Sequence, residues 1–524
     1  MDPYIYKVTE ERRNGPVIFI SREIAYTFPF SFAYLAGYLK EKGETVEILF
    51  KPRNDNEICE TIKKVIQKKP ILVAMGGLFP ELEEMRKWIT LFNLYGRDIP
   101  LVIGGQMVSP TPELAMKVTG ANFGVIGEGE IILYQLVSSL RNNEDLTQIG
   151  GLIIRLDTDD LISTGPGEII ENLSQLPAIP FELFPEEEWV PIGQWYCCHF
   201  PQAHWYYSDR VIPVHGGRGC PFQCNFCYHH SKPRYRNIPE MLSEAKRALI
   251  SYHGNVLYFG DDLVLGNPKR AAELVKELER QEIHCSYSLS TRFDILSRID
   301  NELLLKIKNS GCRIIGLGIE SGSDRILKII GKNCTSQVII EQLRRLKEVG
   351  IIPTVSIMVG QYSETKEDVE KSIQLMQIAV RENPNINFAF TICTPFPGSR
   401  LYQEIFNHKY LKDEMEYYQK YFGNSRIGDW NLIVNMSRMS DLEVKEMFDK
   451  INKIYQNERV KALGYRLLLF ERAFQILCIV NKFLIKYLNI FKVSKKISYP
   501  IENISTKIII SLDKIRLRLR GISY

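Results

Sequence analysis

The sequence predicts an α/β protein with two successive groups of βα units and a helical tail. Short apolar runs rich in β-branched residues alternate with amphipathic stretches over residues 1–145, and the same alternation returns over residues 211–400. Such alternation is typical of parallel sheets whose strands are joined by helices. A chain of 524 residues is also too long for one hydrophobic core, so several domains are expected.

The first domain is expected over residues 1–145, with strand-like runs at 17–20, 45–50, 71–75, 101–104 and 123–127. Ligands of open parallel sheets bind beyond the carboxyl ends of the strands, where glycine-bearing loops follow three of these runs. Glycine lets a backbone approach a ligand closely, although a glycine after a strand is as often a simple turn. The candidate ligand contacts in these loops are Gly76, Gly104, Gly105, Gly127, Glu128 and Gly129.

Residues 146–210 are expected to form a connector. A strand-like run, GGLIIRL, is followed by Pro177, Pro180, Pro185 and Pro191, which rule out a long helix. The segment WYCCHFPQAHWYY then brings together Cys197, Cys198, His199 and His204. Because adjacent side chains of the two cysteines point in different directions, we expect this segment to pack at the mouth of the next domain, near a substrate, rather than to bind a metal.

The strongest chemical signal is the CxxxCxxC motif of Cys220, Cys224 and Cys227. Three thiolates on one loop can hold three irons of a 4Fe-4S cluster and leave the fourth iron open to a small-molecule ligand. Zinc is an alternative, but structural zinc needs a closed set of four ligands, for which His229 or His230 would have to supply the fourth. Three unrelated core thiols are the remaining interpretation.

The motif lies between the apolar run 211–214 and a helix-like segment, 239–253, where a strand-to-helix loop belongs. This placement resembles the radical SAM superfamily, in which S-adenosylmethionine (SAM) chelates the open iron. The resemblance implies that Phe226 packs on the adenine and that the domain at 211–400 is a partial barrel of six βα units. Its strand-like runs are 212–215, 256–260, 286–290, 313–319, 354–360 and 387–393.

The ends of these runs carry the other expected SAM contacts. Gly260, Asp261 and Asp262 occupy the place of the superfamily's glycine-rich acidic motif, although Asp262 would also suit the start of a helix. Arg292 could pair with the methionyl carboxylate or simply lie on the surface. Glu320, in GIESGSDRIL, resembles the fourth-strand motif and is expected to contact SAM. The fifth-strand segment departs from the family because Gln361-Tyr362-Ser363 stands where Pro-Gly is usual.

The first 145 residues, with GGQMVSPTPEL and VIGEGE, look like the Rossmann-like cobalamin-binding-type domain that precedes the barrel in one radical SAM subfamily. No histidine occurs before His199, so the Asp-x-His-x-x-Gly motif that places imidazole on cobalt is absent. The resemblance therefore implies cobalamin without a histidine ligand from its own domain, and the alternative is a vestigial or repurposed domain.

Together these resemblances imply an enzyme that reductively cleaves SAM at a 4Fe-4S cluster and functionalises an unactivated carbon. With cobalamin the expected reaction is C-methylation, while radical cyclisation or rearrangement is an alternative, as is a non-catalytic iron-sulphur protein. Expected partners are an electron donor such as flavodoxin or ferredoxin and a small-molecule, lipid or peptide substrate. No catalytic residue is assigned.

The last part of the chain is unusual in charge. Residues 401–456 are expected to close the barrel, whereas residues 457–524 hold 14 Lys or Arg against 4 Asp or Glu. This asymmetry argues against a nucleic-acid binder and directs any anionic partner to the tail. The longest uncharged run, Ala473–Asn481, is too short to cross a bilayer.

The tail is expected to be an amphipathic helix. It would either rest on anionic lipid or pack on the barrel, in a protein otherwise expected in the cytoplasm because no signal peptide is recognisable. Its expected polar face comprises Glu471, Gln475, Lys482, Lys486 and Asn489, opposite Phe474, Leu477, Phe483, Leu484 and Leu488.

Overall fold

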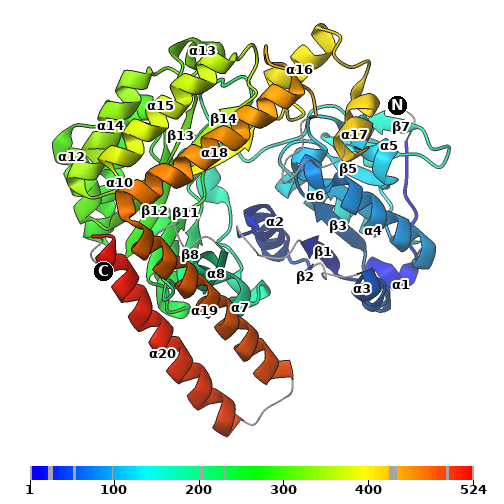
Figure 1. The fold of residues 1–524 in the computed structure, drawn as a ribbon. Helices are drawn as coiled ribbons and strands as arrows, with labels where there is room; N and C mark the ends of the chain where they lie inside the picture. The colour runs from blue at the N-terminus through cyan, green and yellow to red at the C-terminus, as the bar shows by residue number, and fades with distance from the viewer. Residues whose placement is uncertain are drawn as a thin grey trace. The chain divides into compact units, whose positions relative to one another are not determined.

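The computed structural model describes residues 3–21, 28–50, 55–96, 98–199, 205–228, 231–423, 433–490 and 495–521. The chain folds into two compact units, whose elements are shown in Figure 1. The first unit comprises Met1–Glu186, Gly217–Asn237 and Thr394–Val434, and the second comprises Glu187–Gly216, Ile238–Cys393 and Asn435–Tyr524. The cysteine loop thus clusters with the N-terminal domain and not with the barrel strands that flank it in the sequence.

The first unit is built on a seven-stranded sheet of order β2-β1-β3-β4-β5-β6-β7. The predicted parallel strands are present, and they pair side by side in the order β2, β1, β3, β4 and β5. These strands are β1 (Val17–Ser21), β2 (Val46–Phe50), β3 (Leu72–Gly76), β4 (Leu101–Gly104) and β5 (Phe123–Val125). The helices between and after them are α2 (Phe30–Glu41), α3 (Asp55–Gln67), α4 (Leu82–Tyr95), α5 (Pro112–Thr119) and α6 (Glu130–Asn142).

Two antiparallel strands extend this sheet beyond the boundary expected at residue 145. β6 (Leu152–Arg155) pairs with β5, with Leu152 opposite Val125, and β7 (Leu161–Ser163) pairs with β6. The run GGLIIRL is therefore part of the first domain and not of a connector, because its apolar side chains are buried in the same core.

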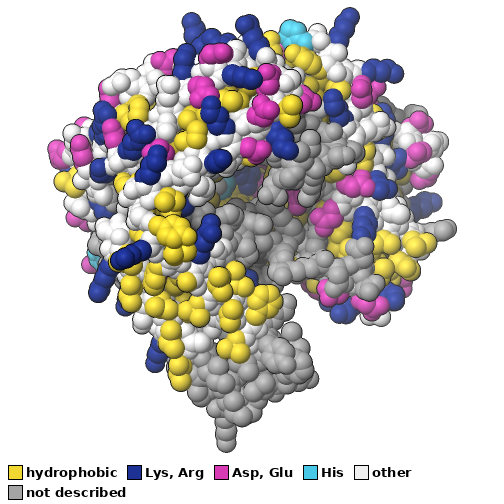
Figure 2. Space-filling view, viewed as in Figure 1, with side chains coloured by type: hydrophobic (Ala, Val, Ile, Leu, Met, Phe, Trp, Pro, Cys, Tyr) yellow, Lys and Arg dark blue, Asp and Glu magenta, His cyan; other side chains and the backbone are white. Residues whose placement is uncertain are grey.

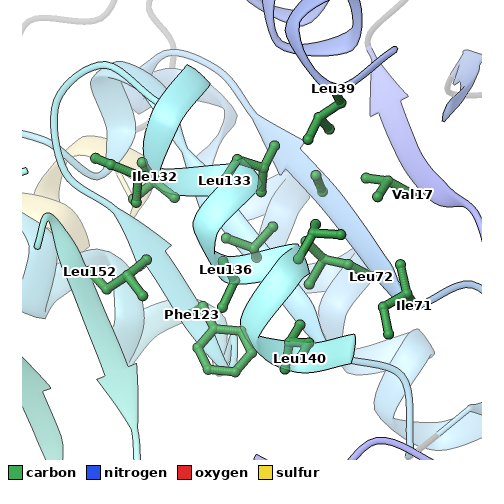
Figure 3. Close-up of a cluster of buried hydrophobic side chains, with 14 of the residues drawn as sticks. Val17, Leu39, Ile71, Leu72, Phe123, Ile132, Leu133, Leu136, Leu140 and Leu152 are labelled. Carbon is green, nitrogen blue, oxygen red and sulfur yellow. The ribbon is translucent and has the colours of Figure 1, made fainter. Parts of the chain in front are cut away.

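Helix α6 covers the sheet through its apolar face. Leu133, Leu136 and Leu140 lie over Phe123 and Leu72 in the buried cluster of Figure 3. Spacing of three and four residues puts these leucines on one side of the helix, and complete burial of such a side chain contributes about 1.5–3 kcal/mol to stability. The helix that follows the Gly127-Glu128-Gly129 loop is thus fixed on the sheet.

A later part of the chain returns to the first unit. Helices α16 (Arg400–Asn407) and α17 (Glu414–Gly423) belong to it, and the ring of Tyr417 lies 5.7 Å from that of Phe79, just after β3. The region 401–456 therefore does not act as a single barrel-closing element, because its first half packs through aromatic contacts on the N-terminal domain.

The second unit contains the predicted partial barrel, a six-stranded parallel sheet of order β15-β14-β13-β12-β11-β8. Its strands are β8 (Val211–Val214), β11 (Val256–Phe259), β12 (Ser286–Thr291), β13 (Cys312–Glu320), β14 (Ile352–Val359) and β15 (Asn387–Ile392). The main helices between them are α9 (Ile238–Ser251), α10 (Pro268–Arg280), α12 (Asn301–Asn309), α14 (Ser336–Val349) and α15 (Lys366–Glu382). Strands that pair in sequence order in this way leave β8 and β15 as the two edges.

The aromatic segment before β8 packs at the opposite end of the barrel from the one expected. Tyr196 stacks on Trp205, and Trp205 is buried with Val211 and Val256, the first residues of β8 and β11. The expectation of a place at the barrel mouth is therefore wrong for these residues, because their rings cover the amino ends of the strands. His204 and the side chains of Cys198 and His199 lie outside the described residues.

Three long helices complete the second unit. α18 (Asp441–Leu463) starts with a capping box between Ser440 and Glu443 and packs on α15. α19 (Tyr465–Ile490) and α20 (Lys495–Leu519) pack on each other as a hairpin, and α19 also contacts α8 (Ile192–His199). Within the described part of the chain, no helix combines the length and hydropathy needed to cross a bilayer.

Candidate functional site

The cysteine loop leaves the sheet of the second unit and is closed at its neck by a short antiparallel ribbon. β9 (Gly217–Arg218) pairs with β10 (Arg234–Tyr235), with Arg218 opposite Arg234. Gly219 has φ of +74°, and a Cβ there would overlap the carbonyl oxygen of Ser231. A residue without a side chain is therefore required where the chain enters the loop.

Within the loop, none of the three cysteines forms a disulfide. Cys224 is buried, Cys220 is half-buried and Cys227 is exposed, and the amide of Cys227 donates to the carbonyl of Cys224 at 3.1 Å. Phe226, the expected adenine contact, is half-buried beside them. The three thiols of the turn thus differ in exposure, and none is tied up in a disulfide.

Two carboxylates after β5 hold this loop. Arg218 donates to Glu128 at 2.7 Å and to Glu130 at 2.5 Å, and the hydroxyl of Ser231 donates to Glu128 at 2.6 Å. Arg234 makes a further ion pair with Glu128. Burial alone would raise the pKa of Glu128, but the charges of the two arginines and the Ser231 hydrogen bond outweigh burial and keep that pKa below its ordinary value.

Glu128 was expected to contact cobalamin, and the structure instead brings it to the neck of the cysteine loop. Its two oxygens accept from Arg218, Ser231 and Arg234. Sequence reasoning missed both arginines, because charge complementarity between positions about 90 residues apart leaves no local pattern. One signal could have revealed these contacts. Two acids, Glu128 and Glu130, follow β5, and two arginines flank the cysteine motif.

The glycines of the first unit fall into two classes. Gly76, Gly77 and Gly105 serve packing, because the amide of Gly77 donates to Gly104, and a Cβ at Gly105 would press on the carbonyl of Gly77. A Cβ on Gly127, whose φ is +88°, would meet no atom within 4 Å, and one on Gly104 would meet only Val125 at 3.8 Å. Backbone that opens on free space at the carboxyl ends of β4 and β5 suits close approach by a flat ligand.

The barrel strands end in buried polar groups. Asp261, after β11, accepts from the amide of Gly216 at 2.6 Å and lies 3.9 Å from His215, so it orients the end of β8. Gly260 is half-buried beside it, whereas Asp262 is exposed. Arg292, after β12, is buried and donates to Asp294 at 2.9 Å, which excludes the surface position that was its alternative.

Glu320 ends β13 in a left-handed conformation, with φ of +66°, at an irregularity of the β13–β14 register. A non-glycine residue held there costs about 1–3 kcal/mol and is found mostly at functional positions. Lys332 Nζ lies 3.2 Å from Glu320 Oε1, and the Ser356 hydroxyl donates to Oε2 at 3.1 Å. Both partners are residues that sequence reasoning missed.

The altered loop after the fifth barrel strand hydrogen-bonds to the backbone of Glu320. The side-chain amide of Gln361 donates to the backbone carbonyl of Glu320 at 2.7 Å, a contact that proline could not make. Glu364 is fully buried and accepts from the amides of Gly360 and Gln361 at 2.7 and 3.2 Å. Burial raises the pKa of Glu364 to about 8, although these hydrogen bonds oppose the shift.

Residues 214–376 match the model of the radical SAM superfamily, and residues 24–137 match that of the B12 binding domain. The chain therefore contains a radical SAM domain preceded by a B12-binding domain. Both predicted resemblances are thereby confirmed, and so is the predicted order of the two domains.

Relatives of this radical SAM protein carry out different reactions. An uncharacterized methyltransferase of Pyrococcus horikoshii is 27% identical over 72% of this chain and 78% of its own. An anaerobic magnesium-protoporphyrin IX monomethyl ester cyclase of Rubrivivax gelatinosus is 24% identical over 83% and 74%. A cytidylyl-2-hydroxyethylphosphonate methyltransferase of Streptomyces wedmorensis is 21% identical over 83% and 87%.

Solved structures share the fold of the radical SAM protein. The methyltransferase TsrM of Kitasatospora setae, with tryptophan and a SAM analogue bound, aligns with a TM-score of 0.61 at 18% identity, over 75% of this chain and 76% of its own. The cobalamin-dependent SAM radical enzyme OxsB, with aqua-cobalamin and SAM bound, aligns with a TM-score of 0.66 at 15% identity, over 97% and 76%. At such identities the likeness establishes the architecture.

The donors of the cysteine loop fit a 4Fe-4S cluster. In a cubane each thiolate binds a different iron, so three thiols spread along one loop suit it. His229 and His230, the candidates for a fourth zinc ligand, lie outside the described residues.

Proposed function

We propose that this radical SAM enzyme methylates an unactivated carbon with the help of cobalamin. The observation that carries the proposal is the pairing of Glu128, from the loop after β5 of the B12-binding domain, with Arg218 and Arg234 at the neck of the three-cysteine loop. A buried ion pair between these two loops fixes their relative position, which a reaction shared by two cofactors requires. The methyltransferase relatives agree with this assignment.

Each group of residues has a part in this proposal. Cys220, Cys224 and Cys227 would hold the cluster, and Phe226 would pack on the adenine of SAM. Gly260, Asp261, Asp262, Arg292 and Glu320 would surround SAM from the strand ends, while the open backbone at Gly104 and Gly127 would receive cobalamin. When bound, the cluster supplies the electron that cleaves SAM to methionine and a 5′-deoxyadenosyl radical, and cobalamin supplies the methyl group.

The protein's own residues orient the groups that hold the cofactors and shield them from solvent. Asp261 holds the backbone at Gly216, where the chain leaves β8 toward the cysteine loop. Lys332 balances the charge of the buried Glu320 carboxylate at the end of its strand, with Nζ 3.2 Å from Oε1. We place the enzyme in the cytoplasm, with flavodoxin or ferredoxin as electron donor and a small molecule, lipid or peptide as substrate.

The test is the set of products formed from SAM. The full chain, reconstituted without oxygen with iron, sulphide and cobalamin, is given dithionite and SAM. We expect 5′-deoxyadenosine and, because one SAM is the methyl source, S-adenosylhomocysteine as well. No 5′-deoxyadenosine from protein that carries a full cluster would favour a non-catalytic iron-sulphur protein instead.

Cyclisation is the second candidate, favoured by the similarity to the magnesium-protoporphyrin ester cyclase of Rubrivivax gelatinosus over most of both chains. A cyclase consumes no methyl group. Formation of 5′-deoxyadenosine without S-adenosylhomocysteine, in protein loaded with cobalamin, would therefore select cyclisation over methylation.

A further inference from the structure

The C-terminal hairpin of α19 and α20 is anchored to the base of the barrel by buried polar contacts. Asn481 donates to the hydroxyl of Tyr207 at 3.0 Å, and the amide of Tyr207 donates to Asp513 at 2.6 Å. Arg516 donates to the carbonyl of Trp205 at 2.8 Å. The hairpin is thus part of the second unit, and its orientation on that unit is fixed.

The inner face of α19 is more polar than expected, and its outer face is more apolar. Glu471 is buried and forms ion pairs with Arg459 and Arg520, so its expected place on an exposed polar face is wrong. Phe474, on the expected apolar face, is buried against Cys197 and Cys478, as packing on the barrel implies. Tertiary packing has therefore buried residues from both expected faces of the helix.

A stripe of apolar side chains faces solvent along α19. It consists of Leu469, Ile476, Val480 and Phe483, spaced by seven, four and three residues, which places them on one side of the helix. Ile476 is 62% and Phe483 68% exposed. A helix packed on a protein core normally turns polar residues outward, so this stripe needs a partner.

Helix α20 repeats the pattern. Ile504, Ile508, Ile515 and Leu519 are spaced by four, seven and four residues, and Ile504 and Leu519 are 60% and 58% exposed. Figure 2 shows hydrophobic side chains gathered over both helices of the hairpin. The two stripes therefore form one apolar surface, which we define by these eight residues and call the hairpin face.

Basic residues border the hairpin face. Lys507 and Arg518 are exposed along α20, next to its stripe, and Arg472 is exposed on α19. The two hairpin acids whose side chains the structure describes, Glu471 and Asp513, are buried in ion pairs with arginines. The described outer surface of the hairpin therefore carries positive charge at Arg472, Lys507 and Arg518.

We propose that the hairpin face rests on an anionic lipid bilayer. Apolar side chains flanked by lysine and arginine match the boundary between acyl chains and phosphate groups. A second copy of the chain fits less well, because a symmetric contact would set the bases of one face against those of the other. This inference rests on the surface of the hairpin and is independent of the reaction proposed above.

The experiment measures binding of the full chain to vesicles by sedimentation, without oxygen. Vesicles of phosphatidylcholine alone are compared with vesicles that also contain phosphatidylglycerol. We expect binding to the anionic vesicles to exceed binding to the neutral ones by about tenfold or more, and to weaken as salt is raised, since screening acts on exposed charges.

Two sets of variants separate the contributions. Val480→Ser with Phe483→Ser removes apolar contact, and Lys507→Glu with Arg518→Glu reverses charge; each pair is expected to reduce anionic-vesicle binding about tenfold. The matched control is Ile250→Ser with Leu305→Ser, two exposed apolar residues on α9 and α12, which should leave binding unchanged. Circular dichroism and the melting temperature check that each variant is folded.

Three results would overturn the proposal. The first is equal binding to neutral and anionic vesicles, and the second is binding that the hairpin variants do not alter more than the control pair does. The third is a dimer in sedimentation velocity runs that Val480→Ser with Phe483→Ser dissociates, because the hairpin face would then be covered by a second copy. Since SAM cleavage is not measured, failure here leaves the proposed reaction untouched.

Discussion

The cysteine loop and the strand ends of the barrel both carry expected cofactor contacts, but they are held in place in different ways. The loop is held from outside, by Arg218 and Arg234 on carboxylates of the B12-binding domain. The strand ends are held by their own neighbours in the sheet, as Glu320 is by Ser356 one strand away. The loop has little regular structure and is held by charged partners distant in the sequence, whereas the strand ends are aligned first by the backbone hydrogen bonds of the parallel sheet.

The largest expected effect comes from removing a cluster ligand from the cysteine loop. Cys224→Ala removes the buried thiol, so the cluster loses one of its three ligands, and both bound iron and 5′-deoxyadenosine formation should be abolished. Iron and sulphide assays and chromatography of the nucleoside check this. Cys59→Ala is the control, because Cys59 lies on α3 of the N-terminal domain, and it should retain both. A full cluster in Cys224→Ala protein would refute the ligand assignment.

The next largest effect is expected from weakening the ion pairs of Glu128 with Arg218 and Arg234, which we call the clamp, while the three thiols stay in place. Glu128→Gln removes a buried negative charge from the half-buried Arg218 and Arg234, and loss of one partner of a buried ion pair costs up to about 3–5 kcal/mol. We expect the free energy of unfolding, from urea titration, to fall by that order, together with faster loss of iron during dialysis.

An exposed ion pair provides the control for the clamp. Glu302→Gln breaks the pair with Lys306, whose partners are 59% and 79% exposed at their side chains, and should cost less than about 1 kcal/mol. An equal loss in the two variants would show that Glu128 is no clamp, and the contrast between the two regions would then disappear.

At the strand ends, Lys332→Met tests whether Glu320 depends on its counter-ion. The substitution leaves a buried carboxylate unpaired, and a hydrogen bond to a charged group is worth about 1.5–3 kcal/mol, or roughly tenfold to a hundredfold in SAM affinity. Equilibrium dialysis with labelled SAM measures it. Lys328→Met, at an exposed position of α13 (Asp324–Ile329), should bind SAM normally; the same loss there would remove the special role of Lys332.

The last prediction concerns pH. Burial raises the pKa of Glu364 to about 8 from its ordinary value of 4.5, so the folded protein keeps this proton where the unfolded chain has lost it. Stability should therefore fall as pH rises from about 4.5 to about 8, by at most about 1.4 kcal/mol per pH unit, and level off above. The side chain of the Glu364→Gln variant cannot ionise. The unfolding midpoint of this variant should therefore depend less on pH over that window than the midpoint of the wild type. Parallel pH profiles would contradict the assignment.

Much of the fold followed from local pattern. The runs 17–20 and 71–75 became β1 and β3, and the runs of the barrel became its strands, because alternation of apolar strands and amphipathic helices has few packed solutions. The run GGLIIRL was misplaced in a connector, since a strand that pairs antiparallel with β5 has no mark of its partner in its own sequence.

The predicted site was incomplete for the same reason. Motif positions such as Glu320 could be named in advance, but Lys332, Ser356 and Gln361 could not, because each acts through a contact that forms only when strands and loops are assembled. The tail shows the limit most clearly: one helical pattern allowed two orientations, and burial of Glu471 against Arg520 selected the one in which Phe483 faces solvent.

By itself, the sequence determined the α/β architecture, the order of the two domains and the chemistry of a three-thiolate loop, because these depend on residue type and short spacing. Only the tertiary structure decided which charges hold that loop and which face of the C-terminal hairpin points outward. Such choices are made by contacts between residues far apart in the chain, whose free energies exist only once burial has removed the surrounding water.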